Sequence, residues 1–139
     1  MDSNEIYAIL EEMHIHYGVY FHKKGEEDLP CVDQKAKCRL YVDLRNHHYL
    51  FIARYHLPLT LEYCEKLLNN TLIEEDRVVC PFSVYGMRSV TVCIDPYFAY
   101  SLLHFSPLDE EATLYMHCQD LIKFYHEHHK EVMWLKLTS

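Results

Sequence analysis

The spacing of apolar residues predicts a helix at the start of the chain. Its apolar side chains recur at intervals of three and four residues and would share one helical face: Ile6, Ile9, Leu10, Met13 and Tyr17. Asp2 or Ser3 is suited to cap this helix, and Gly18 is suited to end it. Residues 19–21 are β-branched or aromatic, which favours a short strand directly after the helix.

The pattern changes to alternation after a polar stretch at residues 23–36, which predicts a long loop. Residues 38–45 carry an apolar side chain at every second position, as in a strand with one buried face. Asn46 and His47 predict a tight turn into a second strand over residues 48–55. The early part of the chain is therefore expected to form a sheet.

The middle of the chain predicts a second helix followed by further strands. Pro58 suits the first turn of a helix, and one apolar stripe follows it at helical spacing: Leu61, Cys64, Leu67, Leu68 and Leu72. Residues 78–84 and 89–94 predict two strands joined by a turn, and Pro81 should keep the first of them at an edge. Residues 97–105 predict another strand.

A third helix is predicted to begin at Ser106 and Pro107, because serine is a good N-cap and proline fits the first helical position. Between residues 114 and 135 apolar side chains recur at intervals of four and three. We therefore expect one α+β domain over residues 1–139. Its expected order is α-β-β-β-α-β-β-α, with three helices, an antiparallel, strongly twisted sheet of about five strands, and room for one extra strand.

Charge narrows the classes of partner. The 139 residues include 13 Lys and Arg against 21 Asp and Glu, a formal net charge of −8. The average field of such a chain repels a nucleic-acid backbone, so we expect no nucleic-acid partner. No apolar run approaches the roughly 20 residues of a membrane helix, and the N-terminus lacks the pattern of a secretory signal. We expect a cytoplasmic protein without a membrane partner.

The residues best suited to metal binding or catalysis are the 11 histidines and the six cysteines. His126 and His129 would share a helical face, but His117 or Cys118 could join them only through tertiary contacts. No C-x-x-C pair occurs, and three glycines are too few for a phosphate loop. We therefore expect buried free thiols, no metal ligands, no cofactor and no catalytic residue.

Aromatic residues are the other departure from ordinary composition, with 12 tyrosines and six phenylalanines. Five tyrosines of the predicted sheet region cannot all point inward if only one face is covered: Tyr41, Tyr49, Tyr55, Tyr97 and Tyr100. An aromatic core and an aromatic binding surface both remain open.

Six short patterns follow one another along nearly the whole chain. They are Tyr17-Gly18-Val19, Leu57-Pro58, Leu67-Leu68-Asn69-Asn70, a Val-x-Val-x-Ile-Asp pattern at residues 90–95, Ser106-Pro107-Leu108-Asp109, and Trp134 near the end. Their order resembles that of the class I type III secretion chaperones, the family that includes the Tir chaperone. Small size and acidity agree with this resemblance.

The resemblance implies a non-catalytic cytoplasmic homodimer that keeps the N-terminal segment of a secreted effector extended and secretion-competent, by β-augmentation and apolar pockets. By position, it implies client contacts at Val19, Phe21, Leu40, Val42 and Phe51, and dimer contacts at Leu61, Cys64, Leu68 and Val92. Two alternatives stay open. One is a general adaptor or heterodimeric interaction subunit of similar fold, and the other is a metal-binding protein that uses its His and Cys residues.

Overall fold

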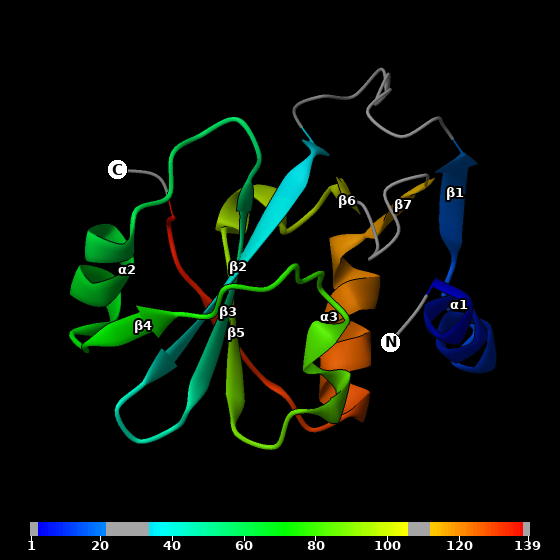
Figure 1. The fold of residues 1–139 in the computed structure, drawn as a ribbon. Coiled ribbons are helices and arrows are strands. Elements are labelled where there is room, and N and C mark those ends of the chain that lie inside the picture. Colours follow the sequence, from blue (N-terminus) through cyan, green and yellow to red (C-terminus); the bar gives the residue numbers. More distant parts are fainter. Residues whose placement is uncertain (1–2, 22–33, 106–111, 138–139) are drawn as a thin grey trace.

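The fold is known from a computed structural model that describes residues 3–21, 34–105 and 112–137 (Figure 1). Within these ranges the elements are α1 Ser3–Glu12, β1 Tyr17–Phe21, β2 Ala36–Asp43, β3 His48–Arg54, α2 Leu61–Leu68, β4 Leu72–Glu74, the 3-10 helix η2 Ser83–Gly86, β5 Val90–Ile94, the 3-10 helix η3 Pro96–Phe98, β6 Leu102–Phe105, β7 Ala112–His117, α3 Cys118–Glu127 and β8 Glu131–Trp134. The predicted α+β class with three helices is confirmed.

The strands form two sheets. One has three antiparallel strands in the order β1-β7-β6, and the other has five strands in the order β4-β2-β3-β5-β8. In the larger sheet the β3–β5 and β5–β8 pairs are parallel, so the predicted all-antiparallel arrangement is wrong for these two pairs. Parallel neighbours need long crossover connections. The first crossover carries α2 and β4, and the second carries β6, β7 and α3.

The five-stranded sheet is covered on both faces. On one face Leu40 and Val92 belong to a core cluster that includes Phe124 of α3 and residues of α1. On the other face Phe51 packs in a second cluster with Cys64 of α2. All five residues of β5 are consequently buried, as expected of a strand between two covered faces.

Residues 78–84 do not form the predicted strand. The chain leaves β4, crosses toward α3 as an extended segment, and turns into η2 (Figure 1). The Ser83 hydroxyl accepts the Cys80 N–H at 2.8 Å, and the Ser83 N–H donates to the Cys80 carbonyl at 3.0 Å. These two bonds hold a turn where a strand would need ladder bonds, and Pro81 between them has no N–H to donate to a ladder.

The predicted third helix is wrong at both ends: its last part, residues 131–134, forms β8, and its first part also differs. Ser106 and Pro107 lie outside the described residues, but residues 112–117 form β7, and α3 begins only at Cys118. Leu114 and Met116 are buried while Tyr115 is exposed, a period of two. Two residues four positions apart lie on the same face of a helix and also on the same face of a strand. The spacing from Leu114 to Cys118 therefore could not distinguish a strand from a helix.

Two smaller expectations also changed. Tyr97 lies in η3 rather than a strand, because the Asp95 carboxylate accepts its N–H at 3.0 Å and caps a 3-10 turn. Most of the predicted loop at residues 23–36 lies outside the described residues, whereas Ala36 already belongs to β2. No helix in the described ranges is long and apolar enough to cross a membrane.

Gly18 does not end α1, which stops at Glu12, but lies in β1 opposite Tyr115 of β7. A Cβ built at Gly18 would come within 2.0 Å of the Tyr115 ring. The tyrosine ring therefore lies directly against the β1 backbone, and a side chain at position 18 would require this exposed ring to move.

Candidate functional site

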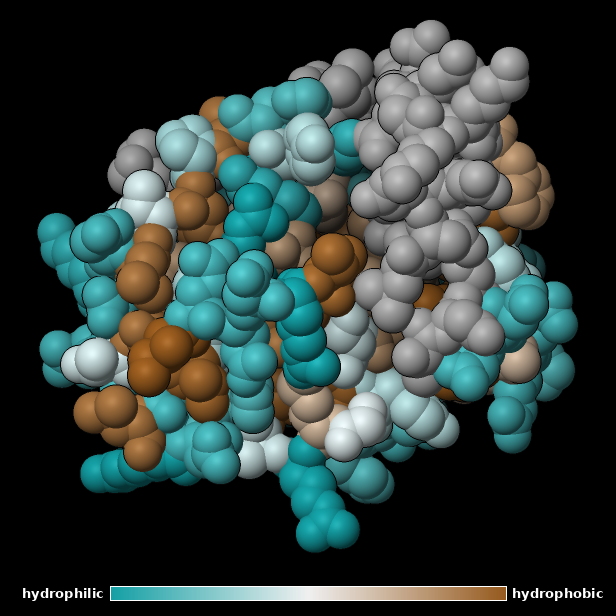
Figure 2. All heavy atoms as spheres, in the orientation of Figure 1, coloured by the Kyte–Doolittle hydropathy of each residue, from teal (hydrophilic) through white to brown (hydrophobic). Residues whose placement is uncertain are grey.

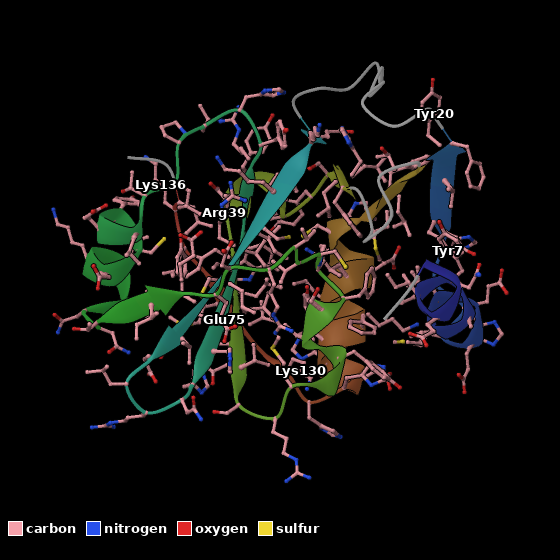
Figure 3. All side chains as sticks on the ribbon, in the orientation of Figure 1. Tyr7, Tyr20, Arg39, Glu75, Lys130 and Lys136 are labelled. Carbon is pink, nitrogen blue, oxygen red and sulfur yellow. The ribbon has the colours of Figure 1, made fainter. Side chains whose placement is uncertain are left out.

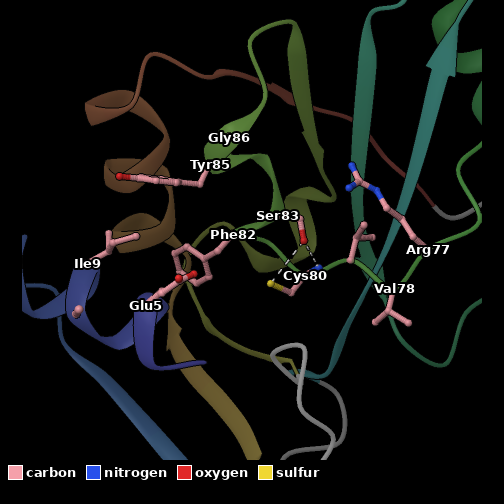
Figure 4. Close-up of a pocket in the computed structure, with 11 residues that line it drawn as sticks. Glu5, Ile9, Arg77, Val78, Cys80, Phe82, Ser83, Tyr85 and Gly86 are labelled. Atoms are coloured by element: carbon pink, nitrogen blue, oxygen red, sulfur yellow. Dashed lines mark hydrogen bonds between the residues drawn. The ribbon is translucent and has the colours of Figure 1, made fainter. Parts of the chain in front are cut away.

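The segment that follows β4 separates two cavities. We call the first the lysine cleft; it has a volume of about 540 Å³ and lies between residues 35–40 of the β2 region and residues 74–80, with Tyr55 and Phe105 completing its lining. We call the second the helix pocket; it has a volume of about 630 Å³ and lies between α1 and residues 77–86 (Figure 4). The two cavities share the wall formed by residues 77–80.

The lysine cleft exists because β4 is short. β4 pairs with β2 only from Tyr41 to Asp43, and the Glu75 N–H makes the last contact, a 2.9 Å hydrogen bond to the Leu40 carbonyl. Beyond that bond the segment that follows β4, residues 75–80, diverges from β2. On this edge Lys35, just before β2, forms an isolated parallel bridge with His104 of β6, and no strand pairs with residues 36–39 within the described residues.

Three cationic side chains alternate along this open half of β2: Lys35, Lys37 and Arg39. The Lys37 Nζ donates to the Leu57 carbonyl, and the Lys35 Nζ lies 3.8 Å from the centroid of the Tyr55 ring. Burial lowers the pKa of both lysines from the usual 10.5, and the nearby Arg39 charge lowers the pKa of Lys37 further. Lysines with lowered pKa values in a cleft are candidates for proton transfer or for binding an anion.

Glu74, Glu75 and Asp76 of the segment opposite β2 also line the cleft, and Figure 3 labels Arg39 and Glu75, which both lie near the middle of the molecule. The Glu75 carboxylate lies 3.0 Å from the His48 Nε2 and 4.0 Å from the Arg77 Nε. These contacts anchor the segment at its start. The cleft is thus close to electrically balanced, although the whole chain carries −8.

The cleft also contains two thiols, Cys38 and Cys80. Burial raises the pKa of both, in Cys38 well above the usual value, so both stay protonated at neutral pH and are poor nucleophiles. All five cysteines in the described ranges are free, and four are buried, as expected, while Cys38 is half-buried. Cys31 lies outside those ranges.

The helix pocket offers less chemistry. Figure 4 shows Glu5 and Ile9 of α1 facing Phe82 and Tyr85, with the Ser83–Cys80 contact at one side. The Phe82 ring is fully buried and meets the Phe124 ring edge-on at 4.7 Å. This pocket is mainly a gap between packed apolar groups, so the lysine cleft is the stronger candidate site.

The predicted client-binding residues do not form one surface. Leu40 and Phe51 are 1% and 0% exposed, which corrects their assignment, because helices cover both faces of their sheet. Val42 is half-buried on β2. Val19 and Phe21 lie on β1 in the other sheet, and only Phe21, 75% exposed, is open to a partner.

The predicted dimer residues are also mainly core residues. Cys64 and Val92 are both fully buried and face opposite sides of the five-stranded sheet, so they cannot share an interface. Leu61 and Leu68 are half-buried and pack against the second core cluster. Figure 2 shows apolar side chains gathered on the α2 and β4 side of the molecule, where some apolar surface remains accessible.

Among the described residues, no three His, Cys, Asp or Glu side chains come close enough to hold a metal ion. His126 lies in the last turn of α3, whereas His129 has left the helix with a φ of 57°. The helical face that the two histidines were expected to share is therefore interrupted.

The sequence interpretation missed Lys35, Lys37 and Arg39. Their signal was a cation at every second position, unusual in a chain in which acids outnumber bases. The opposite wall of the cleft had no such signal, because residues 74–80 meet β2 only through the tertiary fold.

No protein-family model matches the sequence, and neither does any curated protein. Three solved structures share the fold at low identity. A computationally designed epitope scaffold has a TM-score of 0.66 and 17% identity over 96% of this chain and 95% of its own. A candidate trans-editing enzyme for prolyl tRNA synthetase has a TM-score of 0.63 and 15% identity over 96% and 95%. A protein described only as hypothetical has a TM-score of 0.60 and 8% identity over 94% and 97%.

Proposed function

We propose that the lysine cleft binds the aminoacyl end of a charged tRNA and hydrolyses its ester bond. The observation that carries the proposal is the pair of partly buried lysines, Lys35 and Lys37, at a cleft in an otherwise acidic chain. The shared fold with a candidate trans-editing enzyme for prolyl tRNA synthetase supports the substrate class. At 15% identity that likeness concerns the fold, so the activity is our inference.

The proposed chemistry needs one base and one cation. Water attacks the acyl carbon, the bond from that carbon to the ribose oxygen breaks, and the ribose oxygen takes the proton released by the water. In its neutral form, which the lowered pKa favours, Lys37 would accept this proton first, since its amine can donate to the Leu57 carbonyl and still offer its lone pair. Protonated Lys35 would stabilise negative charge on the acyl oxygen or on the terminal phosphate.

This proposal departs from two sequence expectations for stated reasons. A lysine on a strand belongs to no short catalytic motif, so the expectation of a non-enzyme rested on the absence of known patterns. The expectation of no nucleic-acid partner rested on net charge, whereas the proposed substrate enters the cleft only with its single-stranded terminus.

The test is hydrolysis of a panel of tRNAs, each charged with a different amino acid. We expect release of at least one amino acid, about 100-fold slower in the Lys37→Met variant. The matched control, Lys66→Met on the exposed side of α2, should keep the wild-type rate. The wild-type rate, corrected for spontaneous hydrolysis, should rise with pH and level off below the usual lysine pKa of 10.5.

No hydrolysis of any charged tRNA would contradict the proposal, and so would an unchanged rate in Lys37→Met. Methionine keeps the length of the side chain without its charge, and thermal unfolding of each variant separates a lost reaction from a lost fold.

A second candidate function is the secretion chaperone that the sequence resembles. The observation that favours it is the edge position of β1, which among the described residues pairs only with β7, together with the 75% exposure of Phe21. An extended client could add a strand at that edge and cover Phe21. We expect capture of N-terminal effector segments and a dimer by light scattering, with capture weakened in Phe21→Glu. A strict monomer that captures no segment would exclude this candidate, and co-purification with a different subunit would favour an adaptor.

A further inference from the structure

Three exposed tyrosines follow the ends of β3 and β5 along the chain, and we call them the tyrosine shelf: Tyr55, Tyr97 and Tyr100. They are 45%, 42% and 91% exposed. Tyr55 also lines the cleft itself. Single exposed aromatic rings are common on protein surfaces and need no explanation. A group of them next to a candidate site marks a contact surface.

The topology explains why the shelf lies at one edge. β3 and β5 are parallel neighbours with Ile52 opposite Ile94, and Tyr55 and Tyr97 each follow three residues later. Both rings therefore leave the sheet at its carboxyl edge, where the β3–α2 connection and η3 lie close together (Figure 1). The Tyr55 N–H donates to the Lys35 carbonyl at 2.9 Å, which ties the shelf to the start of β2.

Two of the rings carry a cation on one face. The Lys35 Nζ lies 3.8 Å from the Tyr55 centroid, and the Arg54 Cζ lies 3.8 Å from the Tyr97 centroid. A cation on one face of a ring leaves the other face for a flat group and supplies positive charge beside it. The nearest carboxylate along the chain, Asp95, is 3% exposed and accepts the Tyr97 N–H, so it does not offset this charge at the surface.

We propose that the tyrosine shelf stacks the bases of single-stranded nucleic acid, with Lys35 and Arg54 beside the phosphates. Aromatic faces combined with local cations are how sequence-tolerant single-strand sites are built. This inference rests on the proposed function for the identity of the strand, which is the unpaired 3′ end of the tRNA. The shared residue Tyr55 connects the stacked bases to the cleft that receives the aminoacyl group.

The experiment measures binding separately from hydrolysis. The probe is a short, uncharged single-stranded RNA that ends in CCA and carries a fluorescent label at its 5′ end, and the readout is fluorescence anisotropy at low salt. We expect Tyr97→Ala to weaken binding about tenfold and Tyr97→Phe to preserve it, because stacking needs the ring and not the hydroxyl. Arg54→Gln should lower the slope of log affinity against log salt by about one.

The matched control is Tyr20→Ala, which removes a tyrosine of similar exposure, 39%, on β1 far from Arg39 and the cleft (Figure 3). Its affinity for the probe should equal that of the wild type. Thermal unfolding of every variant excludes loss of the fold as the cause.

The outcomes separate this inference from the proposed function. Tenfold weaker binding in Tyr97→Ala without hydrolysis of any charged tRNA would support the shelf and reject the deacylase. Hydrolysis of charged tRNA with no probe binding, or with an unchanged KM in Tyr97→Ala, would reject the shelf and leave the cleft. Binding of a peptide but not of the RNA at the shelf would also overturn the inference.

Discussion

The lysine cleft and the helix pocket differ in chemistry although they differ little in size, about 540 against 630 Å³. They share the wall at residues 77–80, but β2 lines one with cations while α1 and η2 line the other mainly with apolar side chains. The larger cavity is a packing gap between elements. The smaller one holds the lysines whose pKa values burial lowers. Cavity volume is therefore a weaker guide to function here than the titratable groups in the lining.

The largest expected effect on stability comes from the helix pocket. Phe82→Ala removes a fully buried ring that packs on Phe124, and should cost about 3–5 kcal/mol of the free energy of unfolding. Urea unfolding measures the loss. If the two cavities function independently, the hydrolysis rate per folded molecule of this variant equals that of the wild type. A hydrolysis rate that falls further than the fraction of folded protein would show that the cavities are coupled.

A smaller effect is expected at the shared wall. The Tyr125 hydroxyl, fully buried, donates at 2.7 Å to the carbonyl of Pro81, the residue directly after the wall, and so ties the end of the wall to α3. Tyr125→Phe leaves that carbonyl unpaired and should cost about 1–2 kcal/mol. The control is Tyr63→Phe, which loses a similar 2.9 Å bond to the Lys136 carbonyl at the surface and should stay within about 0.5 kcal/mol of wild type. Equal losses in the two variants would mean that the wall does not depend on this bond.

The smallest effect is expected at the far end of β2, away from both cavities. The Asp43 carboxylate accepts the N–H groups of Arg45 and His47, each at 2.9 Å, and an amide N–H of Asn70 at 3.1 Å. These bonds hold its pKa below the usual 3.8, with the His47 N–H the largest cause. Asp43→Asn should therefore be less stable than wild type at neutral pH and leave both cavities unchanged.

The sign of the pH dependence follows from that lowered pKa. A carboxylate favoured in the folded state stabilises the fold above its unfolded pKa, and this contribution is lost as pH falls through the lower folded pKa. The difference in unfolding midpoint between wild type and Asp43→Asn should have its full size at pH 6 and decrease as pH falls below 3.8. A difference that is constant down to pH 2.5 would show that the carboxylate charge is not the cause.

Local patterns predicted three elements of the larger sheet and its cover. The strands around residues 38–45 and 48–55 and the helix that contains Cys64 are close to β2, β3 and α2. The parallel pairing of β5 was missed, although a strand in which every residue is buried is typical of a parallel sheet covered on both faces. The strand β7 was missed for another reason, because its apolar spacing suits a helix equally well.

The candidate site was predicted only in fragments. The possibility of an aromatic core is confirmed for Tyr41, which is 2% exposed, whereas Tyr55, Tyr97 and Tyr100 are exposed and their role as a binding surface stays a proposal. That Tyr97 lies near Arg54 and Tyr55 depends on the parallel pairing of β3 with β5, a contact between distant parts of the sequence. No local pattern contains that information.

The close contact between Gly18 and Tyr115 has a consequence for strand register. In the observed register a Cβ at position 18 would come within 2.0 Å of the ring, and a slip by two residues would bring Tyr20 or His16 under the same ring. The missing side chain at Gly18 therefore favours this register of β1 on β7, because any other residue there would require the exposed Tyr115 ring to move.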